Sequence, residues 1–133
     1  MDTTGETTEA TTGKKVLLIE DEPNIIEAVS FILSRDGWEV KTHSNGHDAM
    51  DTVRARRPDL IILDVMLPGK SGYDILEEIR ADADFAKTPV LMLTARGQVK
   101  DRETAERAGA DQYMTKPFSN ADVLAAVRAL VGA

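Results

Sequence analysis

Short runs of aliphatic residues alternate with amphipathic segments along the chain from residue 14 onward. Aliphatic runs bounded by turn residues predict five strands, over residues 15–19, 38–42, 60–63, 90–93 and 111–114. The run at residues 60–63 has no polar interruption, which is typical of a strand buried on both faces of a parallel sheet. The pattern therefore favours a sheet whose two faces are both covered.

A helix is predicted after each of these strands. Apolar residues at helical spacing place the five helices at residues 23–36, 46–57, 72–83, 99–108 and 119–131. Pro23 suits a first helical turn, the second helix ends before Pro58, and Gly109 is typical of a helix C-cap. Regular alternation of strand and helix predicts an α/β domain with a parallel sheet and right-handed crossovers.

The first 13 residues differ in composition from the rest of the chain. Thr, Glu and Gly dominate them and leave little to bury, so we expect residues 1–13 to form a disordered Thr-rich tail. Residues 14–133 are enough for one domain with a substantial core. We expect no separate output domain, because the last predicted helix reaches residue 131.

Net charge excludes some classes of partner. The chain of 133 residues carries a formal charge of −7, which disfavours direct binding to nucleic acid and to anionic membranes. No apolar run approaches the roughly 20 residues of a membrane span. The absence of cysteine excludes disulfides and thiolate metal sites. A cytoplasmic location fits these features.

Polar side chains follow the aliphatic runs at the carboxyl ends of the predicted strands. They are Glu20, Asp21 and Glu22 after the first strand, Asp64 after the third, Thr94 after the fourth and Lys116 after the fifth. Because the carboxyl ends of parallel strands share one edge of the sheet, we expect one crevice to hold several carboxylates, a hydroxyl and an ammonium.

This combination of groups suits phosphoryl chemistry. Clustered carboxylates repel one another unless they are protonated or bridged by a cation. Oxygen ligands without sulfur or clustered His favour Mg²⁺, Mn²⁺ or Ca²⁺ over zinc. A Lys and a Thr hydroxyl can bind phosphoryl oxygens, and an Asp can act as the nucleophile that forms an acyl phosphate. The residues therefore predict a Mg²⁺-dependent phosphoryl site centred on Asp64.

Four segments resemble the receiver domain of two-component response regulators. They are VLLIEDE at residues 16–22, PDLIILDVMLPGKSG at 58–72, PVLMLTAR at 89–96 and GADQYMTKPF at 109–118. All four stand in order and at the right spacing, so the resemblance extends from residue 15 to residue 131. It implies the flavodoxin-like receiver fold, a five-stranded parallel sheet of order 2-1-3-4-5 flanked by five helices.

The resemblance assigns a phosphoacceptor and a metal site. Asp64 matches the phosphoacceptor, and Glu20 and Asp21 match the acidic pair that holds Mg²⁺, for which Mn²⁺ can substitute. Asp21 is implied to be the more direct ligand. The first position is often Asp, and Glu there is a familiar variant that can act through water. Met66 is implied to offer its backbone carbonyl. Its side chain cannot orient an attacking water, so we expect a long-lived phosphoryl group.

The resemblance also assigns a switch. Thr94 matches the hydroxyl residue that contacts the phosphoryl group, and Lys116 matches the lysine that pairs with it. The Lys116–Pro117 bond is usually cis in the family. Tyr113 matches the aromatic residue whose rotamer responds to phosphorylation, and the face formed by the fourth helix, fifth strand and fifth helix then binds a downstream protein.

The implied partners are a sensor histidine kinase or a histidine phosphotransfer protein, and an unidentified downstream target. Receivers fused to DNA-binding domains often dimerise through charged pairs on that same face. Here Gln112 follows Asp111, and Ala125 and Ala126 stand where such families tend to carry a basic residue. We therefore expect a stand-alone, chemotaxis-receiver-like regulator that is mainly monomeric and catalyses only its own phosphorylation and dephosphorylation.

Other interpretations stay open at this point. Asp64 or Thr94 alone could cap a turn, and Lys116 alone could be a solvated charge. A phosphatase of the haloacid dehalogenase type also uses an Asp after a buried strand, but it places a second Asp where this chain has Met66. A phosphorylation-independent interaction module on the same fold is a further alternative, which the full set of acidic, hydroxyl and lysine positions disfavours.

The two histidines, His43 and His47, fall away from the predicted crevice. We interpret His43 as a surface residue of the second strand and His47 as a surface residue of the second helix. Neither has the clustered partners that a metal site needs.

Overall fold

The computed structural model describes residues 14–95 and 99–131, and the predicted tail at residues 1–13 lies outside them. Five parallel strands form one sheet in the order β2-β1-β3-β4-β5, as the resemblance implied. The strands are β1 (Lys15–Ile19), β2 (Glu39–His43), β3 (Leu60–Asp64), β4 (Val90–Ala95) and β5 (Gln112–Lys116). The predicted flavodoxin-like fold is therefore confirmed.

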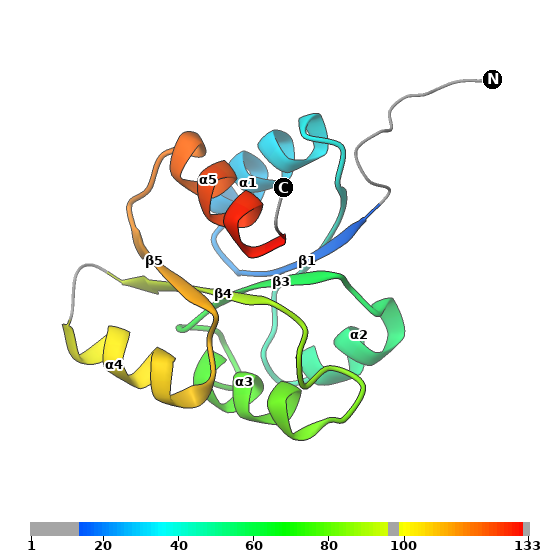
Figure 1. The fold of residues 1–133 in the computed structure, drawn as a ribbon, viewed down its shortest axis with the longest axis vertical. Helices are drawn as coiled ribbons and strands as arrows, with labels where there is room; N and C mark the ends of the chain where they lie inside the picture. The colour runs from blue at the N-terminus through cyan, green and yellow to red at the C-terminus, as the bar shows by residue number, and fades with distance from the viewer. Residues whose placement is uncertain (1–13, 96–98, 132–133) are drawn as a thin grey trace.

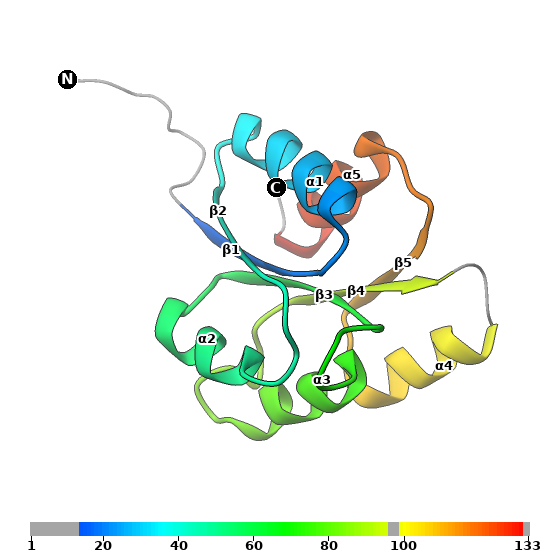
Figure 2. The ribbon, with the colours of Figure 1, turned by 180° about the vertical axis from the view of Figure 1, so that it is seen from behind.

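Helices cover both faces of the sheet (Figure 1). They are α1 (Pro23–Arg35), α2 (Ala49–Arg56), α3 (Gly72–Ala81), α4 (Val99–Ala108) and α5 (Asn120–Val131). Helices α1 and α5 lie together on one face, and α2, α3 and α4 lie on the other, as the reverse view in Figure 2 also shows. None of the described helices is both long and apolar enough to span a membrane.

Two hydrophobic cores follow from the alternation of side chains along the strands. On β1, Leu17 and Ile19 pack towards α2 and α3, whereas Val16 and Leu18 pack towards α1 and α5. All five residues of β3 are buried, because this central strand is covered on both faces. The aliphatic run that predicted β3 is thus explained by its position in the middle of the sheet.

Several predicted boundaries were wrong by a few residues. Strand β2 begins at Glu39, because Trp38 belongs to the turn that ends α1 and donates its backbone N–H to Leu33. Strands β4 and β5 extend to Ala95 and Lys116, beyond their aliphatic runs. Hydrogen bonds between neighbouring strands continue through polar residues, which hydrophobicity alone does not reveal.

Two helix starts show how local contacts set the boundaries. Helix α2 begins at Ala49 instead of Gly46, because the Gly46 N–H donates to the carbonyl of Pro68 and ties the loop before α2 to the loop after β3. Ser119 caps α5 instead of belonging to it: its hydroxyl accepts from the Asp122 N–H, and the Asp122 carboxylate accepts from the Ser119 N–H.

The loop after β3 closes tightly over the end of that strand. A Cβ at Gly72 would collide with the backbone carbonyl of Asp64, so only glycine fits at the start of α3. The Gly72 N–H donates to the carbonyl of Val65 over 2.9 Å. This turn holds the backbone of Asp64 in place at the carboxyl edge of the sheet.

Candidate functional site

The parallel register brings the predicted site residues to one edge of the sheet. Asp64 is the last residue of β3, Glu20 directly follows β1, and Lys116 is the last residue of β5. Asp64 pairs with Leu93 of β4, one residue before Thr94. Ala95 pairs with Lys116. Residues from four separate segments therefore meet beside Asp64.

Three carboxylates form an acidic triad, Glu20, Asp21 and Asp64, in which one oxygen of each lies within 4.8 Å of the others. Glu20 is 0% exposed and Asp64 is 2% exposed, whereas Asp21 is open to solvent. Two buried carboxylates and one exposed carboxylate make a site that is closed on the protein side and open on the solvent side.

The Glu20 carboxylate is only partly satisfied. Its Oε2 accepts hydrogen bonds of 3.1 Å from the backbone N–H groups of Asp21 and Glu22. Its buried Oε1 has no hydrogen-bond partner among the described residues, although Lys116 Nζ lies 3.1 Å away. Burial raises the pKa of Glu20; the Glu22 N–H opposes the rise and the Asp64 charge adds to it.

Asp64 has contacts that hold its carboxylate in one orientation. Its Oδ1 accepts from the backbone N–H of Met66 at 3.3 Å and from Lys116 Nζ at 3.2 Å. Burial raises the pKa of Asp64, and the charge and hydrogen bond of Lys116 counteract only part of that rise. A buried carboxylate whose charge is this poorly compensated attracts a cation.

Lys116 contacts carboxylates on three sides. Its Nζ lies 2.8 Å from Glu22 Oε1, 3.1 Å from Glu20 Oε1 and 3.2 Å from Asp64 Oδ1. Burial favours a lower pKa for Lys116, but the hydrogen bond to Glu22 and the charges of Asp64 and Glu20 outweigh it and raise the pKa. The Lys116–Pro117 peptide bond is cis, as expected.

The two predicted switch residues lie on β4 and β5. Thr94 is buried, and its hydroxyl donates to the carbonyl of Met114 at 3.3 Å. Tyr113 is half-buried and packs against the core on the face of the sheet that α2 and α3 cover. Met66 stands apart from these residues, because its side chain is 71% exposed at the rim of the site.

The donor set fits a divalent cation. The triad offers only carboxylate oxygens, which are the ligands that Mg²⁺ and similar hard cations prefer. Glu20 Oε1 is a buried acceptor that lacks a hydrogen bond among the described residues, and a cation bound to the triad would compensate it. The acidic triad is therefore able to bind a divalent ion.

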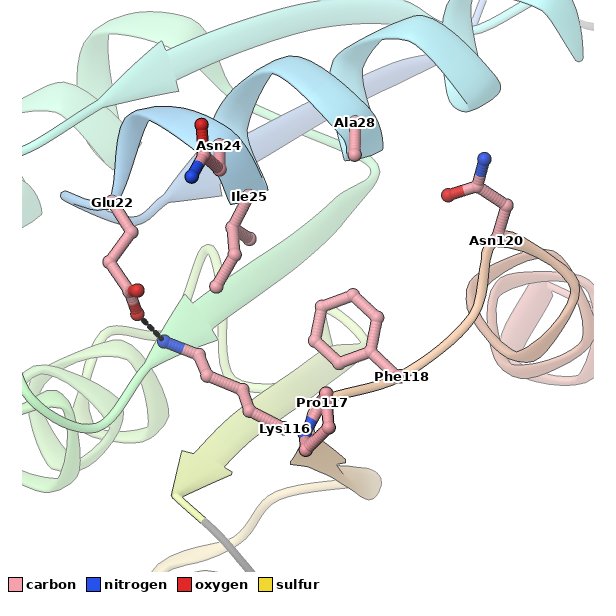
Figure 3. A pocket seen from close by; sticks show the side chains of 8 residues that line it. All are labelled: Glu22, Asn24, Ile25, Ala28, Lys116, Pro117, Phe118 and Asn120. Atoms are coloured by element: carbon pink, nitrogen blue, oxygen red, sulfur yellow. Dashed lines mark hydrogen bonds and ion pairs between the residues drawn. The ribbon is translucent and has the colours of Figure 1, made fainter.

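Sequence reasoning missed one contact of this site. The sequence placed Glu22 in the crevice with Glu20 and Asp21 but gave it no partner there, and its side chain makes no capping hydrogen bond. It pairs with Lys116 instead (Figure 3). The two residues are 94 positions apart, so no local pattern could have indicated the pair.

The histidines lie elsewhere, as predicted. His43 is less exposed than a surface residue, because its Nε2 lies 2.7 Å from Asp48 Oδ1 and its side chain is 21% exposed. This pair lowers the pKa of Asp48, chiefly through the hydrogen bond from His43. His47 is exposed in the turn before α2 rather than in the helix itself.

Comparison with known proteins identifies the class to which this fold and site belong. The model of the response regulator receiver domain matches residues 16–128, so the chain belongs to this family. Receiver domains are phosphorylated by histidine kinases, and the chain is accordingly a phosphoacceptor signalling module with an acidic metal site instead of a conventional enzyme.

Individual proteins resemble the chain over most of its length. The probable transcriptional regulatory protein TcrX of Mycobacterium tuberculosis is 44% identical over 116 residues, which are 87% of this chain and 49% of TcrX. The chain thus spans about half the length of such curated relatives. A putative response regulator of Chloroflexus aurantiacus matches with a TM-score of 0.86 and 29% identity, covering 90% of this chain and 98% of that one.

A third relative has a solved structure that contains a metal ion. The receiver domain of the sensor histidine kinase PA1611 from Pseudomonas aeruginosa matches with a TM-score of 0.83 and 31% identity, covering 92% of this chain and 100% of that one. That structure has a magnesium ion coordinated in its active-site cleft.

Proposed function

We propose that Asp64 accepts a phosphoryl group from a histidine kinase or a histidine phosphotransfer protein, with Mg²⁺ as cofactor. The observation that carries this proposal is the position of Asp64: a buried carboxylate at the end of β3, within 4.8 Å of two further carboxylates and 3.2 Å from Lys116. No other described acidic cluster combines burial, a metal-ligand set and a lysine in this way.

The transfer is a substitution at phosphorus. An oxygen of the Asp64 carboxylate forms the new O–P bond, and the P–N bond to the phosphohistidine breaks. The imidazole leaves with the electron pair and takes up a proton. The hydrogen bonds from Met66 N–H and Lys116 Nζ to Oδ1 orient the carboxylate for in-line attack. Catalysis of this kind is mostly positioning and charge stabilisation.

Glu20, Asp21 and Asp64 would hold the metal, together with the backbone carbonyl of Met66. When bound, the ion neutralises the charge that builds up on the transferred oxygens. Asp21 is the solvent-exposed member of the triad and would meet the incoming ion first. Lys116 then pairs with a phosphoryl oxygen, and the Thr94 hydroxyl exchanges its bond to Met114 for another phosphoryl oxygen.

The proposed output is a rearrangement of the face formed by α4, β5 and α5. Movement of Thr94 towards the phosphoryl group would free the space beside it, and Tyr113 would turn inward to fill that space. A downstream protein that binds only one of the two packings then reads the phosphorylation state. We propose that the domain is mainly monomeric and acts in the cytoplasm.

Mass spectrometry of the intact protein tests the assignment of Asp64. With acetyl phosphate and Mg²⁺, the wild type should gain the mass of one phosphoryl group, and Asp64→Ala should gain none. Asp59→Ala is the matched control, because Asp59 lies just before the opposite end of the same strand. Full phosphorylation of Asp64→Ala would refute the proposal, and so would equal loss in both variants.

A further inference from the structure

We propose that Glu22 is a positioning residue that occupies Lys116 until a phosphoryl group replaces it. The inference rests on the proposed role of Asp64 and adds a competitor for the lysine. The starting observation is that the shortest contact of Lys116 Nζ, 2.8 Å, is made with Glu22 and not with either buried carboxylate.

Glu22 is held in place for this contact. Its backbone N–H donates to Glu20 Oε2 at 3.1 Å, and its carbonyl accepts from the N–H groups of Ile25 and Ile26 in the first turn of α1. Its side chain makes no capping hydrogen bond and extends across to Lys116 (Figure 3). The carboxylate is thus directed to the lysine by an ordered backbone.

The hydrogen-bonding capacity of Lys116 is filled in this arrangement. An ammonium group has three N–H donors and no acceptor. Lys116 Nζ donates to Glu22 Oε1, to Asp64 Oδ1 and, at 3.4 Å, to Glu20 Oε2. A phosphoryl oxygen on Asp64 can therefore gain a full hydrogen bond from Lys116 only if one of these contacts is given up.

Burial decides which contact is released. The Glu20 and Asp64 side chains are both buried, so neither can exchange its contact with Lys116 for water. The Glu22 side chain is 58% exposed and lies beside a cavity of about 480 Å³ between α1 and the loop after β5, where water can solvate it. Release of Glu22 costs the least, so the phosphoryl group displaces Glu22 from Lys116.

Glu22 and the phosphoryl group therefore compete for Lys116, and this competition disfavours the phosphorylated state. Glu22 keeps Lys116 extended and oriented in the resting protein, but it also lowers the affinity of the lysine for the incoming anion. Removal of the Glu22 charge should therefore strengthen binding of a phosphoryl group. Because exposed ion pairs are weak, the gain should be about threefold.

The test measures the affinity of the full chain for beryllofluoride, a phosphoryl mimic, by NMR titration at saturating Mg²⁺. Glu22→Gln should bind about threefold more tightly than the wild type. Glu27→Gln is the matched control: it removes the same charge from an exposed position of α1 and should leave the affinity unchanged. Equal affinities of the wild type and Glu22→Gln would overturn the inference.

Glu22→Asp separates the contact from the charge. The shorter side chain keeps its charge but cannot reach Lys116 at 2.8 Å, so it should also bind beryllofluoride more tightly than the wild type. The ¹⁵N shift of the Lys116 ammonium in the unligated protein should change in both Glu22 variants. Wild-type affinity in Glu22→Asp, or an unchanged ammonium shift in both variants, would contradict the inference, because a general charge effect would suffice.

Beryllofluoride binding by Asp64→Ala distinguishes failure of the proposed function from failure of the inference about Glu22. If Asp64 is not the phosphoacceptor, Asp64→Ala will bind beryllofluoride as the wild type does. If only the Glu22 inference is wrong, Asp64→Ala will lose binding while Glu22→Gln and the wild type remain equal.

Discussion

Arg80 and Lys116 are both partly buried cations, but they lie at opposite edges of the sheet. Arg80 extends from α3 to the amino ends of β4 and β5, where its guanidinium donates to the carbonyls of Gly109, Ala86 and Thr88 and to the Asp111 carboxylate. One cation thus meets one carboxylate and several neutral acceptors, and its charge is balanced.

Lys116 lies at the carboxyl edge among more negative charge than it can neutralise. It contacts three carboxylates, one of which has a buried oxygen without a hydrogen-bond partner among the described residues. The comparison separates a cation whose charge is balanced within the protein from one whose surroundings carry excess negative charge. The amino edge is satisfied within the protein, whereas the carboxyl edge needs a cation from outside and can then receive a phosphoryl group.

The largest expected effect on stability comes from Arg80 at the amino edge of the sheet. Arg80→Met should lower the free energy of unfolding by about 3 kcal/mol, because several carbonyls lose their shared donor and Asp111 loses its ion pair. Urea denaturation measures the change. Arg54→Met is the control, since Arg54 makes only exposed ion pairs and should change stability by less than about 1 kcal/mol. Equal effects of the two substitutions would contradict this contrast between the edges.

The second prediction concerns the acidic triad at the carboxyl edge of the sheet. Mg²⁺ at about 100 times its dissociation constant should stabilise the wild type by about 2.7 kcal/mol, because the ion binds the folded triad. Thermal unfolding with and without Mg²⁺ measures the effect, and Asp21→Asn should remove most of it. Na⁺ at the same ionic strength controls for screening. An identical response of Asp21→Asn and the wild type would show that the ion binds elsewhere.

Removal of the Asp64 charge should stabilise the metal-free protein. Burial raises the pKa of Asp64, so the folded state binds more protons than the unfolded state above the ordinary carboxyl range. Stability therefore falls as pH rises from about 4 through the raised folded pKa. At neutral pH, Asp64→Asn should gain about 1 kcal/mol, and its denaturation profile should depend less on pH. A loss of stability at neutral pH would mean that the pair with Lys116 outweighs burial.

The smallest expected effect lies at the exposed rim. Met66 has no group that could orient a water molecule, and its side chain is 71% exposed. Met66→Asn should accelerate loss of the phosphoryl group about threefold, which corresponds to less than 1 kcal/mol in the barrier. Decay of the phosphorylated protein after removal of the phosphodonor gives the rate. The idea fails if Met66→Asn and Met66→Leu decay equally fast.

The carboxyl edge was largely predictable from sequence, and the amino edge was not. Buried runs that end in Asp64 or Thr94 place polar groups at a known edge of a parallel sheet, so the site followed once the strands were assigned. Arg80 reaches acceptors up to 31 positions away, and no periodic pattern encodes such contacts. Its role appears only when the amino ends of β4 and β5 are brought together in space.

The contact between Glu22 and Lys116 is also hidden from the local sequence. Glu22 stands directly before Pro23, where an acidic residue ordinarily stabilises a helix start. That local pattern does not indicate the partner of its side chain, Lys116, which is 94 positions away at the end of β5. Strand ends such as those of β4 and β5 were also predicted too short, since hydrogen bonding continued through polar residues.

The central claim is that the buried charge of Asp64 exists to receive a phosphoryl group. The most direct test is to treat the protein with acetyl phosphate and Mg²⁺, reduce any acyl phosphate with borohydride, and sequence the peptides by mass spectrometry. The account predicts that residue 64 is converted to homoserine, and only when both phosphodonor and Mg²⁺ are present. An unmodified Asp64, or homoserine at another acidic position, would contradict it.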